Sequence, residues 1–592
     1  MNLMDSSKNK TRYYIILFII ILLQISRIVY TFACLKEGTH SDEIWSYGLA
    51  NSYYEPFIYD TYDHGEMRNN DQWLSSQVMR DYLTVDREHR FSYDSVYFNQ
   101  IYENHPFLFY CLLHTVCSLF PGTFSLWYGF AINIIAFIVT ILFFYKLLFE
   151  ISKSEVTALI GSAFYGFSLG AVNTFIFVRM YALLVMLTTV FLFLHARLYN
   201  NSVAKKNNLF IMLFVFTLLG TLTHHFFIPF AACVSACFCI YYLLNKRIKE
   251  LVLYSVTMLG SVAVSLLIFP ATFRHLFSET IKLPKYTPTW QFMLTLNSVT
   301  KELFGVRLSP VSKISYTALM IVVVFIIVMI LPLVYLVRNE SWLKKIVLVL
   351  KRCPGKIAQT LKSIDLMTVA MFVSSSGIVV LTAAKVSVIA MGDYIDRYVF
   401  FTFPGFCVAF VLFVRWVFHA LIKNKKVSVV VSGIVCGLVC LVSNLYPCHY
   451  LFPKPEDSLS VKKEISGSNC VFISSEYWLL TCFSEDSMDA EYIYAIELND
   501  SEILKEKILK LPVAPDTNCD LYYYVDNHLF YESEVMDGEL VGEMPSKGVY
   551  TQKEKKMERN DFETLLKSKY SKAEYVGYGT VFKRNYSLYK VK

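Results

Sequence analysis

The sequence is poor in charged residues, in glycine and in proline. Only 17% of its 592 residues are Asp, Glu, Lys or Arg, whereas a soluble domain carries about 25%. Its 23 glycines and 17 prolines are too few for a collagen-like or low-complexity chain. Hydrophobic residues make up 55% of the chain, which is too much for a disordered protein and too much for water-soluble cores to bury. A membrane protein with several spans is the class that remains.

The positive net charge has a topological explanation. The chain carries 55 basic and 48 acidic residues, a net charge of +7. The short connections between its apolar runs hold 22 basic residues and far fewer acidic ones, which is typical of cytoplasmic loops. The excess of charge therefore indicates no nucleic-acid partner. The basic segments are 1–12, 146–155, 197–206, 246–249, 338–362 and 415–426.

Placing all of these segments on one side predicts about eleven transmembrane helices, with the N-terminus inside and the C-terminus outside. The first apolar run is too long for a removed signal peptide and lacks a small-residue cleavage site. We expect a multi-pass protein of the plasma membrane. The predicted spans are 13–34, 124–148, 155–176, 180–199, 208–223, 226–244, 251–269, 313–337, 366–390, 395–414 and 427–446.

Three segments are predicted to lie outside without crossing the membrane. Residues 35–104 contain 13 acidic and only 5 basic residues. The apolar stretch 106–120 is too short to span and ends at Pro121-Gly122, so an interfacial or re-entrant helix is expected. A second outer loop covers 270–312. Together with the spans, these segments form a predicted transmembrane domain, residues 1–446.

The polar tail, residues 447–592, is predicted to be a small extracytoplasmic α/β domain. Its strand-like and helix-like runs alternate at 470–475, 501–511, 521–525, 561–569 and 578–591. Four cysteines fall in it, and they form either two disulfides, with three connectivities open, or buried thiols. No CxxC pair indicates a structural zinc site. These cysteines are Cys448, Cys470, Cys482 and Cys519.

Polar residues gather at the predicted outer ends of the spans, while the middles of the spans are almost free of charge. A transporter usually has ionisable groups near the bilayer midplane, so this distribution favours chemistry at the outer surface. The first cluster is Asp42-Glu43, directly after the first span. Such carboxylates are suited to a general base or a metal ligand. The alternative is a helix start in which Ser41 or Asp42 is the N-cap.

Two further clusters carry cations. His105 precedes Pro106 at a predicted helix start, after Glu103 and Asn104, and a helix N-terminus with a histidine suits a phosphate oxygen. The alternative is simple capping by Asn104 or His105. Arg179 lies in the very short connection between two predicted spans. There its side chain either binds a phosphate or extends to lipid headgroups.

The last two clusters are a histidine pair and an Asp-Arg group. Neighbouring helical residues such as His224 and His225 point about 100° apart, so at most one would ligate a metal, and a structural role is the alternative. Arg397 stands with Asp393 and Asp396 at another outer end, and Lys385 lies slightly further in. This group either binds a carrier phosphate or forms an Asp-Arg ion pair.

In their order, these motifs resemble the GT-C superfamily of membrane glycosyltransferases that use polyprenyl-phosphate sugars. Protein O-mannosyltransferases and lipid A aminoarabinose transferases look most similar, with their HPPLYY and R-x-Y motifs. The resemblance covers residues 1–446, but Phe107 replaces the second proline and Asn104 stands where aminoarabinose enzymes have an acid. The matching segments are Asp42-Glu43, NHPFLFY (104–110), RMYAL (179–183) and Arg397-Tyr398.

This resemblance implies an enzyme that moves a hexose or pentose from a polyprenyl-phosphate carrier to an acceptor hydroxyl, with inversion. The acceptor is a protein, a lipid or a glycan, and the surrounding partner is membrane lipid. A lipid-linked glycan flippase and a diphosphate-carrier polymerase or ligase are the alternatives. The implied roles are catalysis for Asp42 and Glu43 and phosphate binding for His105, Arg179 and Arg397. From the polar clusters themselves we add Lys385 as a phosphate ligand and Glu43, Glu103 and His225 as candidate ligands of a divalent cation.

Overall fold

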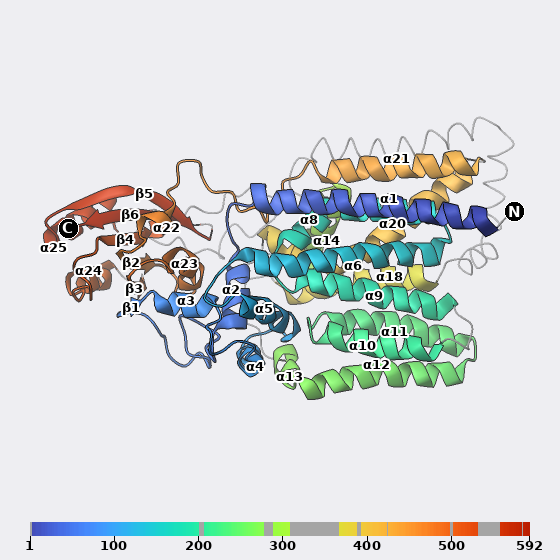
Figure 1. The fold of residues 1–592 in the computed structure, drawn as a ribbon, viewed down its shortest axis with the longest axis horizontal. Helices are drawn as coiled ribbons and strands as arrows, with labels where there is room; N and C mark the ends of the chain where they lie inside the picture. Colours follow the sequence, from blue (N-terminus) through green and yellow to red (C-terminus); the bar gives the residue numbers. More distant parts are fainter. Residues whose placement is uncertain are drawn as a thin grey trace. The chain divides into compact units, whose positions relative to one another are not determined.

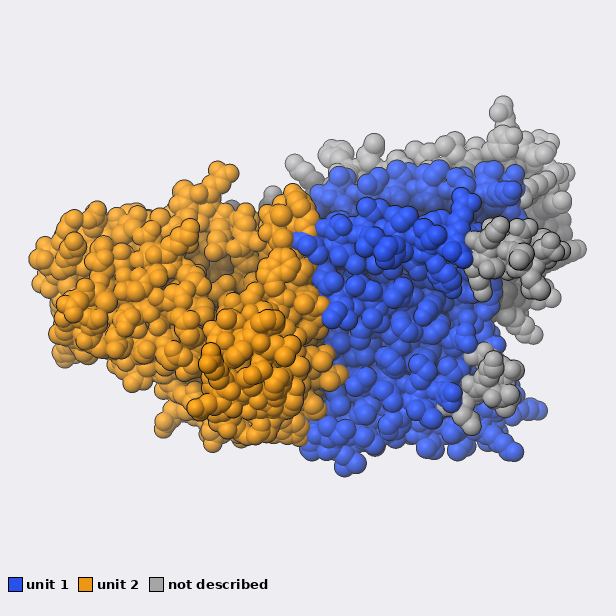
Figure 2. Space-filling view, in the orientation of Figure 1, with its two compact units in different colours: residues 1–29, 133–176, 181–449 blue, residues 30–132, 177–180, 450–592 orange. Residues whose placement is uncertain are grey.

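The computed structural model forms two compact units (Figure 2). Unit 1 comprises residues 1–29, 133–176 and 181–449, and unit 2 comprises residues 30–132, 177–180 and 450–592. The chain thus passes from unit 1 to unit 2 between His449 and Tyr450. The structure describes residues 3–200, 206–277, 288–307, 366–386, 392–422, 424–497, 501–530, 557–582 and 584–592.

Unit 1 consists of long apolar helices (Figure 1). Within the described residues, eight helices are long and apolar enough to cross a membrane, or nine if one bent pair counts as a span. This confirms the prediction of a multi-pass helical protein. The expected span 313–337 lies outside the described residues. The eight helices are α1 (Leu3–Tyr30), which continues as a π-turn (Thr31–Leu35), α6 (Leu126–Ser152), α9 (Tyr181–Asn200), α11 (Phe227–Leu244), α12 (Ile248–Ile268), α18 (Leu366–Lys385), α20 (Phe403–Leu421) and α21 (Lys425–Ser443).

One predicted span is broken. The segment 155–176 forms α7 (Glu155–Gly166) and α8 (Leu169–Ile176), which are bent by 59°. The second helix begins anew because the Ser168 hydroxyl accepts a hydrogen bond from the Ala171 amide at 3.2 Å, as an N-cap does. A Cβ at Gly166 would lie 2.3 Å from Nε2 of Gln24, so a larger residue there would displace the Gln24 amide.

Shorter helices complete unit 1. The expected span 208–223 is the helix α10, and part of the expected outer loop 270–312 is helical. These elements are α10 (Lys206–Thr221), α13 (Ala271–Phe277), α14 (Pro288–Phe304) and the 3₁₀ segments η3 (Gly392–Tyr398) and η4 (Phe400–Thr402).

Unit 2 contains the short apolar helix α5 (Leu108–Leu119). Its twelve residues extend about 18 Å, which is less than the roughly 30 Å thickness of the hydrocarbon core. One face, including Phe109 and Leu113, is buried, while Leu112 and Leu119 are exposed. The other helices of this unit are α2 (Ser41–Asn51), α3 (Gln77–Leu83), α4 (Tyr93–Tyr102), α22 (Val461–Glu464), α23 (Leu479–Ser487), α24 (Ser501–Leu509) and α25 (Arg559–Lys569).

The tail folds around a six-stranded mixed sheet, which confirms the predicted α/β character. The strand order is β1-β3-β2-β4-β6-β5, with parallel pairing among β3, β2 and β4 and antiparallel pairing elsewhere. The predicted β stretch 578–591 is a hairpin that turns at Phe582, where φ is 57°. The strands are β1 (Trp73–Ser75), β2 (Asn469–Ser474), β3 (Tyr492–Glu497), β4 (Leu521–Asp526), β5 (Ala573–Val581) and β6 (Arg584–Val591).

Strand β1 comes from the predicted outer loop 35–104, not from the tail. Trp73 pairs with Tyr494 of β3, and its indole Nε1 donates to the Pro512 carbonyl at 2.9 Å. Asp71 forms an ion pair with Lys507 at 2.8 Å. The outer loop and the tail therefore share one sheet in unit 2.

Helices cover both faces of the sheet, because side chains alternate along its strands. On one face, Val471 and Ile473 of β2 pack in a buried cluster with α24 and α25. On the other face, Phe472 stacks on Phe483 of α23, with ring centroids 4.3 Å apart. The two faces thus form two apolar cores.

The tail cysteines are thiols. All thirteen cysteines of the described residues are free, so the two disulfides do not form; of the four tail thiols Cys470 is buried and the other three are of intermediate exposure. Burial raises the pKa of Cys470 and of Cys482 above the usual thiol range. These thiols therefore stay protonated and act as small apolar side chains.

Truncating a buried side chain of the central strand should destabilise unit 2. We expect Ile473→Ala to lower the free energy of unfolding by about 2–5 kcal/mol, because it leaves a cavity in a packed core. Ile503→Ala is the matched control, since Ile503 is 52% exposed on α24. Chemical denaturation of the full chain in detergent measures both values. Equal losses in the two variants would contradict this packing.

Candidate active site

Helix α2 begins with a capping box built on His40. Nδ1 of His40 accepts a hydrogen bond from the Asp42 amide at 3.0 Å, and the Glu43 carboxylate accepts one from the His40 amide at 2.9 Å. The cap is therefore His40, whereas the sequence suggested Ser41 or Asp42. Because Nδ1 is an acceptor, the imidazole is neutral at this nitrogen. Its approach of 3.7 Å to Oδ1 of Asp42 is then not an ion pair.

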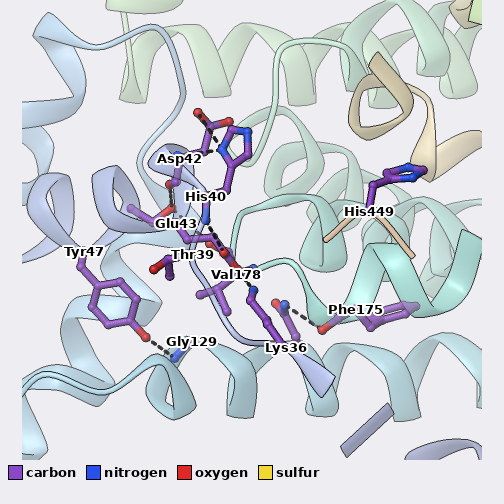
Figure 3. A network of polar contacts seen from close by, with 12 residues as sticks. Lys36, Thr39, His40, Asp42, Glu43, Tyr47, Gly129, Phe175, Val178 and His449 are labelled. Carbon is purple, nitrogen blue, oxygen red and sulfur yellow. Dashed lines mark hydrogen bonds and ion pairs between the residues drawn. The ribbon is translucent and has the colours of Figure 1, made fainter. Parts of the chain in front are cut away.

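The carboxylate of Glu43 is fully buried and holds three segments together (Figure 3). It forms an ion pair with Lys36, and it accepts hydrogen bonds from the amides of His40 and Val178, both at 2.9 Å. The side chains of Lys36 and Glu43 are 2% and 0% exposed. Glu43 thereby ties the end of the first apolar helix and residues 177–180 to the start of α2.

Asp42 has a different environment from its neighbour. Its side chain keeps 11% exposure, and its backbone carbonyl accepts hydrogen bonds from the Ser46 hydroxyl at 2.8 Å and from Nη1 of Arg179 at 3.0 Å. A carboxylate with some exposure is accessible to a reacting hydroxyl, whereas the buried carboxylate of Glu43 is not. The two adjacent acids therefore suit different tasks.

Arg179 is buried in unit 2, at 2% exposure, and does not extend into solvent. Besides Asp42, its Nη1 donates to the Ser46 hydroxyl at 3.3 Å, and its Nη2 lies 3.7 Å from Oε1 of Glu103. Its guanidinium also lies over the Tyr110 ring, 5.8 Å from the centroid. Burial raises the pKa of Tyr110, with Arg179 opposing the shift, so the phenol is neutral.

His105 and Glu103 extend this group from the connection between α4 and α5. Nδ1 of His105 lies 2.9 and 2.8 Å from the two carboxylate oxygens of Glu103. The side chains are 17% and 13% exposed, which leaves the pair partly open. Asp42, Arg179, Glu103 and His105 thus form one connected group inside unit 2.

Two residues that contact the site, Ser46 and Lys36, are not indicated by the sequence motifs. Ser46 lies four residues after Asp42, and this helical spacing places both on one face of α2. Lys36 is a single basic residue just after the first apolar run. Helical spacing was the available signal for Ser46. No local pattern indicates that Lys36 pairs with Glu43.

The other predicted site residues belong to unit 1. Arg397 is 6% exposed, and its guanidinium lies 5.2 Å from the centroid of the Tyr398 ring. Lys385 is the last residue of α18 and is exposed. The ring of His225 lies 5.5 Å from that of His275. His224 uses Nδ1 to accept a hydrogen bond from the Phe226 amide at 3.1 Å, and the side chain of Asp393 lies outside the described residues.

Unit 1 also contains a buried acid-histidine group that the sequence did not predict. Nε2 of His449 lies 2.8 Å from Asp396 and 3.0 Å from Glu302. Burial and the Asp396 carboxylate raise the pKa of Glu302 to about 7. Burial lowers the pKa of His449, but the two carboxylates outweigh it and raise this pKa to about 10. The structure thus pairs Asp396 with His449, a partner that the Asp-Arg alternative did not include.

No family model matches the chain, and no curated protein matches it. Among solved structures, the chain is similar to ArnT from Cupriavidus metallidurans. The apo form has 9% identity and a TM-score of 0.46 and covers 96% of this chain and 97% of ArnT. The undecaprenyl-phosphate complex has 9% identity and a TM-score of 0.45 and covers 98% of each chain.

A second similar structure is the oligosaccharyltransferase AglB from Archaeoglobus fulgidus, in complex with an inhibitory peptide and a dolichol-phosphate. It has 11% identity and a TM-score of 0.41 and covers 88% of this chain and 70% of AglB. At these identities and TM-scores, the similarity assigns no activity to this chain.

Removing the charge of Glu43 should destabilise unit 2 strongly. Glu43→Gln keeps the shape of the side chain but leaves the buried Lys36 ammonium without its counter-charge, so we expect a loss of about 3–5 kcal/mol. Thermal and chemical unfolding of the detergent-solubilised chain measure this loss. Adding Lys36→Met to Glu43→Gln should recover much of it.

The control for the Lys36–Glu43 pair is a solvent-exposed ion pair of the same unit. Arg68 and Glu55 are 30% and 52% exposed, 2.7 Å apart, and Glu55→Gln should cost no more than about 1 kcal/mol. If Glu43→Gln were equally mild, the Glu43 carboxylate would not hold the three segments together.

Proposed function

We propose that this chain is a glycosyltransferase that moves a sugar from a polyprenyl-phosphate carrier to an acceptor hydroxyl at the membrane surface. The observation that carries the proposal is the connected group of Asp42, Arg179, Glu103 and His105 in unit 2. In this group the backbone carbonyl of Asp42 binds the buried Arg179, and Glu103 links Arg179 to the half-buried His105. The group follows an apolar helix long enough to span a membrane, and the carboxylate of Asp42 keeps 11% exposure. Such a pairing suits a reaction that releases a proton and a phosphate together.

The proposed reaction is a single displacement at the anomeric carbon. The acceptor oxygen forms a bond to this carbon, while the bond from the carbon to the phosphate oxygen breaks and the phosphate takes the electron pair. The hydroxyl proton passes to the carboxylate of Asp42, which acts as general base. In-line attack inverts the configuration of the sugar.

Cations would stabilise the charge that develops on the leaving phosphate. In unit 2 these are Arg179, whose planar guanidinium matches phosphate oxygens, and His105, whose ring contacts Glu103 and is 17% exposed. Arg397 and Lys385 of unit 1 are proposed as further phosphate ligands. Arg397 and Lys385 share only their positive charge with the unit 2 residues. The role of Arg397 and that of Lys385 must therefore be tested with separate variants.

The roles of the remaining acids follow from their contacts. We assign Glu43 to positioning and not to catalysis or metal binding, because its carboxylate is already held by Lys36 and two backbone amides. Glu103 and His225 stay candidate ligands of an assisting divalent cation. The donor sugar is proposed as a hexose or pentose, and the acceptor as a protein, lipid or glycan.

Replacing the proposed base should abolish turnover without unfolding the chain. We expect Asp42→Asn to lower donor consumption by about 10²–10⁴-fold, the usual contribution of a general base. The assay incubates purified chain in sealed lipid vesicles with labelled polyprenyl-phosphate hexoses and pentoses and a membrane extract as acceptor source. Asp63→Asn is the control, because Asp63 is exposed in the same outer segment.

Two outcomes of this assay would contradict the proposal. Normal donor consumption by folded Asp42→Asn would remove Asp42 as the base. Movement of labelled donor across the bilayer without its consumption would indicate a flippase.

Replacing His105 should slow the release of the phosphate. We expect His105→Gln to reduce kcat by about 10²-fold, as for the loss of one electrostatic donor, with little change in unfolding temperature. His64→Gln is matched to it, since His64 contacts Asp60 through Nδ1 at 2.7 Å but is 54% exposed. Equal activity of the two variants would remove His105 from the phosphate site.

A further inference from the structure

We propose that Glu302, Asp396 and His449 form a binding site for a divalent transition-metal cation in unit 1. The three residues come from α14, from η3 and from the segment after α21. None of them is among the proposed reacting residues, and the proposal stands whether or not the chain transfers sugars.

The spacing of the three ligand atoms fits one small cation. One oxygen of Glu302, one of Asp396 and one nitrogen of His449 all lie within 4.8 Å of one another. Nε2 of His449 is 3.0 Å from the first and 2.8 Å from the second. Ligand atoms about 2.0–2.1 Å from a tetrahedral zinc ion are about 3.3 Å apart. A slight expansion would therefore accommodate a metal among these atoms.

Burial gives the group a strong need for positive charge. The side chains of Glu302 and Asp396 are both 0% exposed, and that of His449 is 11% exposed. Burying two carboxylates away from water costs free energy unless positive charge or hydrogen bonds compensate them. The single hydrogen on Nε2 of His449 cannot point at both of them. A divalent cation with a neutral imidazole would bind all three atoms and bring their summed charge to zero.

The orientation of Glu302 is fixed from outside the group. Nδ2 of Asn173, on α8, donates to both carboxylate oxygens of Glu302 at 2.8 Å. The Cys448 thiol in turn donates to Oδ1 of Asn173 at 2.7 Å, which determines the direction of the amide. Outer hydrogen bonds of this kind, which orient a ligand before the metal arrives, are typical of metal sites.

The donor set indicates the kind of metal. Two carboxylates and one imidazole are suited to Zn²⁺ or Mn²⁺, and three protein ligands leave a coordination position open. The competing arrangement is an ion cluster without metal, in which protonated His449 and the neighbouring Lys301 neutralise the acids. Lys301 is 4% exposed and acts on Glu302 electrostatically.

Metal binding by the full chain tests the proposal directly. Purified protein in detergent is stripped with EDTA, equilibrated with ZnCl₂ or MnCl₂, desalted and analysed by mass spectrometry of the elements. We expect about one equivalent of metal in the wild type and in His64→Gln, whose ring is 54% exposed in unit 2, and none in the double variant Glu302→Gln/His449→Gln. The unfolding temperature should rise with metal in the first two proteins only, because the bound ion stabilises the folded state.

A second measurement requires only the wild type and one single variant. Bound Mn²⁺ should show a coupling to the ¹⁴N nucleus of an imidazole by pulsed electron paramagnetic resonance, and His449→Gln should lose it. The proposal is overturned if the wild type binds neither metal and its unfolding temperature is unchanged, which indicates the ion cluster. It is also overturned if metal and nitrogen coupling persist in the variants, which places the ion elsewhere.

Discussion

The buried carboxylate of Glu43 is the interaction on which the candidate site depends. It combines the charge of Lys36 with two backbone amides, those of His40 and Val178. The first amide belongs to the cap of α2, and the second belongs to the short segment that carries Arg179. Because one carboxylate holds both, the guanidinium of Arg179 reaches the backbone of Asp42. The two adjacent acids thus have different environments: Glu43 is buried and holds the site together, whereas Asp42 remains accessible.

The tail contributes to this site by supporting the loop that contains it. Strand β1 extends the sheet of the tail, and the hydroxyl of Thr39, next to the cap of α2, donates to Glu485 of α23 at 2.6 Å. The rings of Trp45 and Trp478 lie 6.3 Å apart, which adds an aromatic contact between α2 and the tail. A long polar loop has little apolar surface of its own to bury. The sheet supplies it, which gives the tail a structural function in unit 2.

Among the described residues, two of the buried acid-cation groups differ in design. In unit 2, the carboxylate of Glu103 lies between Arg179 and His105, and the group is partly open. In unit 1, two carboxylates converge on one imidazole and are fully buried. The first arrangement places two cationic side chains around one carboxylate, whereas the second places two carboxylates around one imidazole. The proposals of phosphate binding and of metal binding follow from this difference.

The sequence by itself determined the membrane class, the approximate positions of most described spans, the α/β tail and the candidates Asp42, His105 and Arg179. These features are local: a span must satisfy its backbone within one helix, and a helix or strand shows its own periodicity. Only the tertiary structure decided that α7 and α8 break at Gly166, that His40 caps α2, and that β1 joins the sheet of the tail. It also decided the grouping of Glu302, Asp396 and His449. Most of these features depend on contacts between segments that are distant in the sequence. The choice of cap depends on which of several neighbouring residues with similar capping ability is used. No local sequence pattern encodes such contacts or such a choice.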